Sequence, residues 1–298
     1  MTTPDTTSKK GRRDAARERA RIAREKEQKR RRRNRWFLQG GIALGALAIA
    51  AIVVLVVAQN TQPAGPGPKN MASDGILFQG VDGAITPVTT KALAADADPT
   101  ATDQSEYPDQ AHVVVYEDYL CPYCNQFETA NMPQIKQWVE GGAATLEVHP
   151  FNLLDQSSAG SKYSTRSANA AACVANYQPK QFLNVNSAFF ANQPSENTKG
   201  LTNDEIVSLV KKAGATNSNI PSCIRDGEFT SWVDAATNRV LNEKIPNSSL
   251  DKLTGTPLVL VDGKQYSGSL TDTSAFASFV DETAGASTAT PSATPSAG

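Results

Sequence analysis

Residues 112–128 read His-Val-Val-Val-Tyr-Glu-Asp-Tyr-Leu-Cys-Pro-Tyr-Cys-Asn-Gln-Phe-Glu, which predicts a buried β-strand running directly into a helix. The three valines at 113–115 form the apolar, β-branched run that is typical of a central strand. Cys121 and Cys124 follow at Cys-x-x-Cys spacing, at the expected start of the helix. Backbone N–H groups converge there and stabilise a thiolate, the reactive form of cysteine. The stretch therefore favours thiol–disulfide exchange.

Two other interpretations of this cysteine pair are a structural disulfide and half of a metal site. A zinc site needs about four ligands, and the sequence has no second Cys-x-x-Cys motif. The only histidines are His112, at the wrong end of its strand, and His149, an isolated residue on the next strand. A proline between the sulfurs, Pro122, after a central strand is more typical of a redox motif. No metal site is expected.

The surrounding chain predicts one strand–helix–strand unit. The strand covers 112–118, and the helix covers about 121–140, with a kink at Pro133 and an end at Gly141-Gly142. Residues 144–150 alternate as a second strand. Such a unit implies a parallel strand pair with a right-handed crossover.

Two hairpins are expected, one on each side of this unit. Residues 75–88 place two short apolar runs around Asp82-Gly83, and residues 257–266 place an apolar run before a second Asp-Gly pair. Residues 91–110 are expected to form a loop. Residues 160–245 predict a helical insertion, and residues 272–282 predict a closing helix. Within the insertion we expect helices at 161–177, 179–191 and 228–243, a capping box at Thr202–Glu205 before another helix, and a short turn at Pro221–Asp226.

The N-terminal region has the charge pattern of a membrane anchor. Residues 1–35 carry 15 Lys and Arg against 5 Asp and Glu, a net charge of +10, and residues 37–58 contain no charged residue. As a helix these 22 residues span roughly 33 Å, enough for a hydrocarbon core of about 30 Å. Trp36 is placed as an interfacial aromatic residue. We therefore expect a basic cytoplasmic tail at 1–35 and a transmembrane helix at 36–58.

The positive-inside rule places everything after this helix outside the cytoplasm. A cleaved signal peptide is the alternative, but its apolar core is usually shorter, and Val56-Val57-Ala58 matches a cleavage site poorly. Nucleic-acid binding by the basic tail is the weaker alternative. Residues 59–73 are expected to form a Pro/Gly linker, and residues 284–298 a disordered Ala/Ser/Thr/Pro tail.

The run Cys121–Glu128, placed after a Val-rich strand, resembles the DsbA-like thiol–disulfide oxidoreductases of the thioredoxin superfamily, most of all their membrane-anchored actinobacterial type. The order of strand, active-site helix, strand, helical insertion, Thr256-Pro257 hairpin and last helix is similar too. The resemblance covers about 74–283. It implies an α/β thioredoxin-like fold with an inserted helical subdomain, here preceded by a single transmembrane helix.

The resemblance also implies roles for individual residues. Cys121 would be the attacked thiol and Cys124 the buried resolving thiol. Pro257 would be a cis-proline facing the Cys121 sulfur, and Thr256 would lend backbone groups to a bound substrate. Pro122 and Tyr123 would tune the motif, although Pro-Tyr is also the dipeptide of glutaredoxins, which are reductases.

One departure concerns the proton acceptor. Related oxidoreductases carry a buried acid six residues before the first cysteine, and this position is Val115 here. Glu117 and Asp118 lie nearer to Cys121 and are candidates to replace it, or are solvated residues at the strand end. The absence of the usual acid leaves the Cys121 pKa to the helix N-terminus and local hydrogen bonds.

The other two cysteines of the chain are Cys173 and Cys223, both in the predicted helical insertion. Outside the cytoplasm two such cysteines most often pair, and related actinobacterial proteins carry a second, structural bridge. A second redox relay is the alternative.

The resulting expectation is an extracytoplasmic oxidase that forms disulfides in secreted proteins through the Cys121–Cys124 dithiol, with no cofactor beyond that pair. Unfolded or reduced secreted proteins would be its substrates. The resemblance implies reoxidation by a membrane oxidase of the DsbB or vitamin K epoxide reductase type. The alternatives are a thiol reductase or isomerase, for example in cytochrome maturation, and a non-catalytic thioredoxin-like chaperone or metal carrier.

Overall fold

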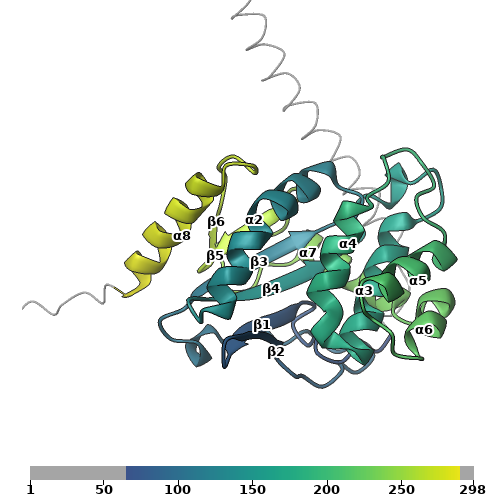
Figure 1. Cartoon of the computed structure of the whole chain (residues 1–298), viewed down its shortest axis with the longest axis horizontal. Helices are drawn as coiled ribbons and strands as arrows, with labels where there is room; N and C mark the ends of the chain where they lie inside the picture. The colour runs from purple at the N-terminus through teal and green to yellow at the C-terminus, as the bar shows by residue number, and fades with distance from the viewer. Residues whose placement is uncertain (1–64, 289–298) are drawn as a thin grey trace, which may run out of the picture. The chain divides into compact units, whose positions relative to one another are not determined.

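The computed structural model describes residues 65–288, which form a six-stranded mixed sheet with helices packed around it (Figure 1). The strand order is β2-β1-β4-β3-β5-β6. The expected cytoplasmic tail and membrane span lie outside the described residues. In residues 65–288, no helix is long and apolar enough to cross a membrane.

The predicted strand–helix–strand unit is confirmed. Strand β3 (Ala111–Glu117) runs parallel to β4 (Ala144–Pro150), and α2 (Pro122–Glu140) connects them. Pro122 occupies the first turn of α2, where a missing backbone N–H costs nothing. Pro133 lies inside the helix without ending it.

Both predicted hairpins are present, and their turns explain the Asp-Gly pairs. Strand β1 (Ile76–Val81) pairs with β2 (Ala84–Pro87), and β5 (Leu258–Val261) pairs with β6 (Lys264–Gln265), both antiparallel. The four turn residues all have positive φ: 53° and 72° in the first hairpin, 46° and 75° in the second. Two consecutive positive φ values define the tight turn that matches the strand twist, and Asp-Gly adopts it readily.

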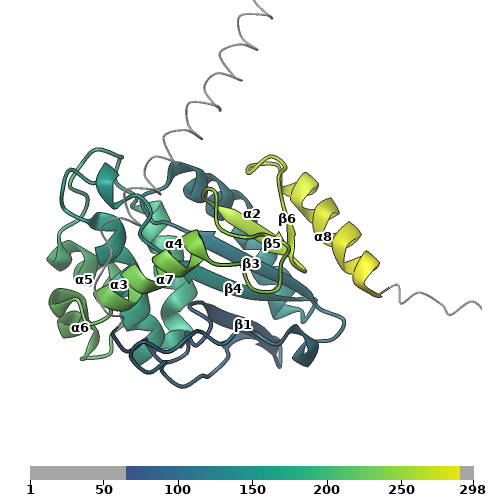
Figure 2. The ribbon, with the colours of Figure 1, turned by 180° about the vertical axis from the view of Figure 1, so that it is seen from behind.

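The expected helical insertion gathers at the end of the sheet opposite α8, as both views show (Figures 1 and 2). Its helices are α3 (Tyr163–Tyr177), α4 (Phe182–Ala191), α5 (Asn203–Lys212), α6 (Ile220–Asp226) and α7 (Thr230–Asn242). The Thr202–Glu205 capping box is formed in full. Short 3-10 turns occupy 104–106, 155–157 and 179–181.

Two predictions about local structure are wrong: one concerns the type of an element, and the other concerns where a helix ends. The short turn expected at Pro221–Asp226 is helix α6, because a proline in the first turn of a helix is tolerated. The closing helix α8 (Thr273–Thr288) continues past Glu282 into the segment expected to be a disordered tail. Ala284 packs against the core there, which explains why the helix continues.

Strand β3 lies at the centre of the core, between β4 and β5. Val113 and Val115 are fully buried and point into the same apolar cluster as residues of α2 and α8. Phe127 of α2 and Phe276 of α8 meet edge to face, with ring centroids 5.2 Å apart. Helix α7 lies over one end of the sheet in the view from behind (Figure 2). The redox motif therefore follows a strand whose residues 113–117 are all buried.

Residues 65–75, here called the clasp segment, pack on the domain, although 59–73 was expected to be a free linker. Met71 is fully buried in the core. Asp74 receives two hydrogen bonds of 2.7 Å from the Arg239 guanidinium of α7 and a third from the indole of Trp232. The described part of the expected linker therefore belongs to the packed domain.

Candidate active site

Cys121 and Cys124 lie at the junction of β3 and α2, as the sequence predicts. Cys121 is the N-cap residue of α2, and Cys124 lies in the first turn. Both thiols are free in this structure. Exposure barely separates them, since Cys121 is 3% exposed and Cys124 1%. Their electrostatic surroundings differ much more.

The two thiols have opposite pKa shifts. A hydrogen bond from the Cys124 thiol, followed by contacts with Thr256 and the backbone N–H groups of Cys124 and Tyr123, lowers the pKa of Cys121 to about 7, against the effect of burial. Burial raises the pKa of Cys124 well above its ordinary value. Near neutral pH a substantial fraction of Cys121 is therefore thiolate, whereas Cys124 stays protonated and donates to it.

Thr256, the residue before Pro257, lies against the first sulfur. The Thr256–Pro257 peptide bond is cis. The sulfur of Cys121 lies 3.6 Å from the carbonyl oxygen of Thr256. The loop before β5 therefore forms one wall of the site, beside the helix N-terminus.

Glu117 and Asp118 are not solvated at the end of β3, so that alternative is wrong. They are 1% and 0% exposed. Burial raises the pKa of Glu117 well above its ordinary value, and the nearby Glu128 carboxyl raises it further. Val115, at the position where relatives carry an acid, is fully buried in the apolar core. Glu117 therefore supplies the buried carboxyl from two residues further along the strand.

Asp118 fixes the turn between strand and helix. Its carboxylate accepts hydrogen bonds from the backbone N–H groups of Leu120 and Leu154, each 2.8 Å, and from the Ser164 hydroxyl at 2.7 Å. Burial raises the pKa of Asp118 to about 7, although these three donors favour the charged form. The side chain ties the redox motif to the start of α3.

Glu128 is a site residue that the sequence reasoning did not single out. It is 3% exposed and lies one helical turn after Cys124, on the same face of α2. Its carboxylate accepts hydrogen bonds of 3.2 Å from Asn186 and Ser187 of α4. Burial raises the pKa of Glu128 to about 7, while the Lys136 ammonium group opposes the shift. The four-residue spacing from Cys124 is the signal that points to it.

The two histidines lie away from the cysteine pair. His112 bonds Thr145 at 2.9 Å, at the start of β3. His149 is buried, lies 3.2 Å from the Glu147 carboxylate and stacks on Tyr116. Within residues 65–288, no group of three or more His, Cys, Asp or Glu side chains is arranged to hold a metal ion.

Tyr123 and Pro122 are the exposed members of the motif, and Tyr123 is the large one. Tyr123 is 58% exposed, beside two buried cysteines, and Pro122 starts the helix. A large exposed aromatic residue next to a nucleophile is available to a substrate chain.

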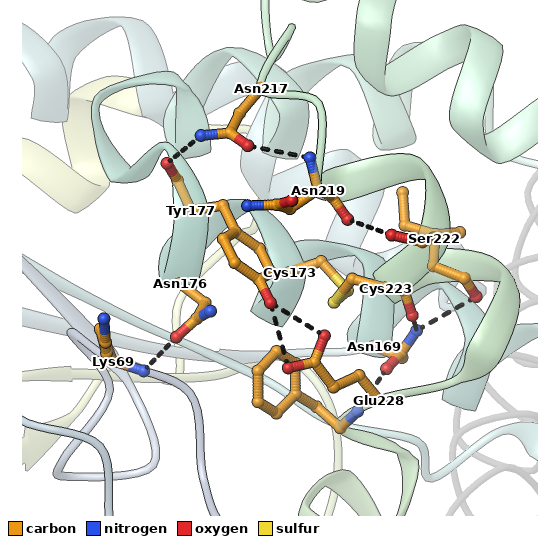
Figure 3. The surroundings of a disulfide bond; sticks show 12 residues. Lys69, Asn169, Cys173, Asn176, Tyr177, Asn217, Asn219, Ser222, Cys223 and Glu228 are labelled. Atoms are coloured by element: carbon orange, nitrogen blue, oxygen red, sulfur yellow. Dashed lines mark hydrogen bonds between the residues drawn. A yellow bond between two sulfur atoms is a disulfide. The ribbon is translucent and has the colours of Figure 1, made fainter.

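Cys173 and Cys223 form a disulfide that joins α3 to α6 (Figure 3). Both residues are buried, at 0% and 2% exposure. Asn169 of α3 donates to the carbonyl oxygens of Cys223 and Ile224, so the bridge is set in a polar network between the two helices. This burial favours a structural role over a second redox relay.

A family model described as thioredoxin matches residues 109–282, more than half of the chain. The chain belongs to the thioredoxin family. None of the curated proteins compared matches it.

Among solved structures, reduced DsbA from Mycobacterium tuberculosis is 27% identical, with a TM-score of 0.53 over 71% of this chain and 93% of that chain. The reduced disulfide bond oxidoreductase DsbG of the same organism is 31% identical over 59% and 78%, with a TM-score of 0.49. MdbA, a thiol–disulfide oxidoreductase from Corynebacterium diphtheriae, shares the fold at 16% identity and a TM-score of 0.51, over 76% and 98%. The resemblance to DsbA-like thiol–disulfide oxidoreductases is confirmed.

Proposed function

We propose that this thioredoxin-family protein is an extracytoplasmic oxidase that forms disulfides in secreted proteins. The observation that carries the proposal is the opposite pKa shift of the two motif thiols, lowered for Cys121 and raised for Cys124. A thiol of low pKa is a good leaving group, so its disulfide is readily transferred to another protein.

The cycle starts from the Cys121–Cys124 disulfide. A substrate thiolate attacks the Cys121 sulfur, a substrate–Cys121 disulfide forms, and Cys124 leaves. A second substrate thiolate then attacks the substrate sulfur of this mixed disulfide and releases Cys121 as a thiolate. The substrate loses two electrons and gains a disulfide, and the motif gains two electrons and becomes a dithiol.

The departing Cys124 sulfur needs a proton because burial raises its pKa. Glu117 is the donor we propose. Its carboxyl interacts electrostatically with both motif sulfurs, and burial raises its pKa well above the ordinary value, which favours the protonated form. Glu128 stands next to it and is linked through Ser187 to Lys136, whose ammonium group donates to the Ser187 hydroxyl at 3.1 Å. This chain of groups provides a route by which the proton is replaced.

We further propose that Thr256 and Pro257 contact the substrate chain, because their loop lies against the Cys121 sulfur. The basic residues at 1–35 and the apolar run at 36–58 support a single-pass anchor with the catalytic domain outside. The buried Cys173–Cys223 disulfide supports an oxidising compartment. A membrane oxidase of the DsbB or vitamin K epoxide reductase type would then restore the motif disulfide.

The test is the reduction potential of the Cys121–Cys124 pair, measured against glutathione. A value around −120 mV, that of DsbA, supports an oxidase, whereas a value near −270 mV, that of thioredoxin, would identify a reductase. Refolding of reduced ribonuclease A with the oxidised protein gives the activity. Cys121→Ala should abolish that activity, and unimpaired refolding with this variant would favour a non-catalytic chaperone.

The topology is tested on the full-length chain. The protein should stay in the membrane fraction after alkaline carbonate washing, and protease added to intact protoplasts should remove the domain. Release by carbonate would contradict the anchor.

A further inference from the structure

Gln193 is a residue of the helical insertion that bonds directly to the backbone of the redox motif. It follows the last turn of α4, and its side-chain Nε2 donates to the carbonyl oxygens of Tyr119 and Cys121, each at 3.0 Å. These two carbonyls flank Leu120. Both hydrogens of one amide group are therefore used on the three residues that lead into α2.

The Gln193 side chain is itself held in place. Its Oε1 accepts a hydrogen bond of 3.1 Å from the Asn125 amide, which also donates to the Phe190 carbonyl oxygen at 2.9 Å. Asn125 lies in the first turn of α2, and its backbone N–H donates to the Cys121 carbonyl oxygen at 3.2 Å. Two donors, one from α2 and one from the insertion, thus meet at the Cys121 carbonyl.

The orientation of the Cys121 carbonyl group affects where the Cys121 sulfur lies. As the N-cap residue, Cys121 has extended backbone angles of φ −75° and ψ 117°. This conformation directs its sulfur toward the backbone N–H groups of Tyr123 and Cys124, which stabilise the thiolate. A residue whose carbonyl is held from both sides keeps that conformation, whereas a free carbonyl can rotate and move the sulfur off these donors.

We propose that Gln193 is a positioning residue for Cys121, through which the helical insertion sets the reactivity of the redox motif. The part of this inference that concerns disulfide transfer rests on the proposed oxidase function. The part that concerns the acidity of the thiol does not.

The test compares Gln193→Met, which keeps the side-chain length and removes both donors, with the wild-type protein. Loss of hydrogen bonding at this site should raise the Cys121 pKa and shift the glutathione equilibrium toward the disulfide by about two- to tenfold, the range expected for one hydrogen bond. The thiolate is followed by its absorbance at 240 nm, and the equilibrium is measured by separating reduced from oxidised protein.

Gln178→Met is the matched control. Gln178 makes a similar amide clamp in the same insertion, donating to Gly214 at 3.2 Å and accepting from the backbone of Thr216 and Asn217 at 2.8 and 2.9 Å. It should lower stability without moving the thiol titration or the equilibrium. A purely structural effect of Gln193 would make the two variants behave alike.

A Gln193→Met protein that folds and titrates like the wild type would overturn the proposal. If that variant fails to fold, Gln193→Glu serves instead, since it keeps the size and places a carboxylate oxygen against the two carbonyls. It should raise the Cys121 pKa further, and an unchanged titration would again overturn the proposal. Failure of the oxidase function is seen separately, as a wild-type potential near that of thioredoxin.

Discussion

The Cys124 thiol donates a hydrogen bond to the Cys121 sulfur, and this contact is the largest factor that lowers the Cys121 pKa. The pair thus differs in acidity although both side chains are almost equally buried.

We expect the reduced protein to show a thiolate titration with a midpoint at about pH 7, measured by absorbance at 240 nm. In Cys124→Ala the hydrogen bond is lost, so the midpoint should move upward. A wild-type midpoint at the ordinary cysteine value of about 8.5 would contradict this assignment.

The buried carboxyl of Glu128 predicts how stability depends on pH. Its pKa is raised to about 7 in the folded protein, from 4.5. The folded state then binds more protons than the unfolded state between these values, so the contribution of this carboxyl to stability is fully present below pH 4.5 and is lost as the pH rises through 7. The whole shift corresponds to about 3 kcal/mol.

Urea denaturation of the reduced protein at several pH values between 4 and 8 measures this effect. Glu128→Gln should flatten the decline of the free energy of unfolding over this window. Glu205→Gln is the control, because Glu205 is a solvent-exposed capping residue whose pKa is lowered instead. Equal slopes in the wild type and Glu128→Gln would disprove the assignment.

The Cys173–Cys223 disulfide should stabilise the insertion without affecting the redox chemistry. Its cysteines are 50 positions apart, and closing a loop of that length contributes roughly 4 kcal/mol in the chain-entropy model. The double variant Cys173→Ala/Cys223→Ala should lose about this much stability in urea while keeping the Cys121–Cys124 potential. A changed potential would indicate that the second pair exchanges electrons with the first.

The buried Asp74–Arg239 ion pair should contribute far more to stability than an exposed ion pair of similar geometry. Arg239→Met leaves the Asp74 carboxylate buried without its cation. The free energy of unfolding should therefore fall by about 3 kcal/mol or more. Arg225→Met breaks a 2.8 Å pair with Asp204 whose side chains are 50% and 81% exposed, and should cost less than about 1 kcal/mol. Thermal unfolding of both variants makes the comparison, and equal losses would contradict it.

Much of the fold could be predicted because its signals are local. Asp-Gly turns, a valine run and a Cys-x-x-Cys each specify structure within a few residues, and the hairpins and the β3–α2–β4 unit follow from them. Helix α6 was missed because Pro221 favours a turn as well as a helical first turn. The same ambiguity affects every proline near a helix start.

The surroundings of the thiols could be predicted only in part, because they depend on contacts distant in sequence. Whether Glu117 and Asp118 are solvated or buried is decided by α3 and α4, which cover the end of β3. Gln193 lies just after α4, where no sequence pattern marks it, yet it contacts residues 72 and 74 positions away. The sequence reveals the reacting atoms, and the insertion determines their surroundings.

The clasp segment limits how far the domain can travel. Under the proposed topology the membrane span ends at residue 58, and residue 65 already bonds Ser231 of α7, which leaves six residues between them. Fully extended, such a connection reaches about 25 Å. So short a connection would keep the domain close to the membrane surface. Under that topology the domain would meet secreted chains beside the membrane.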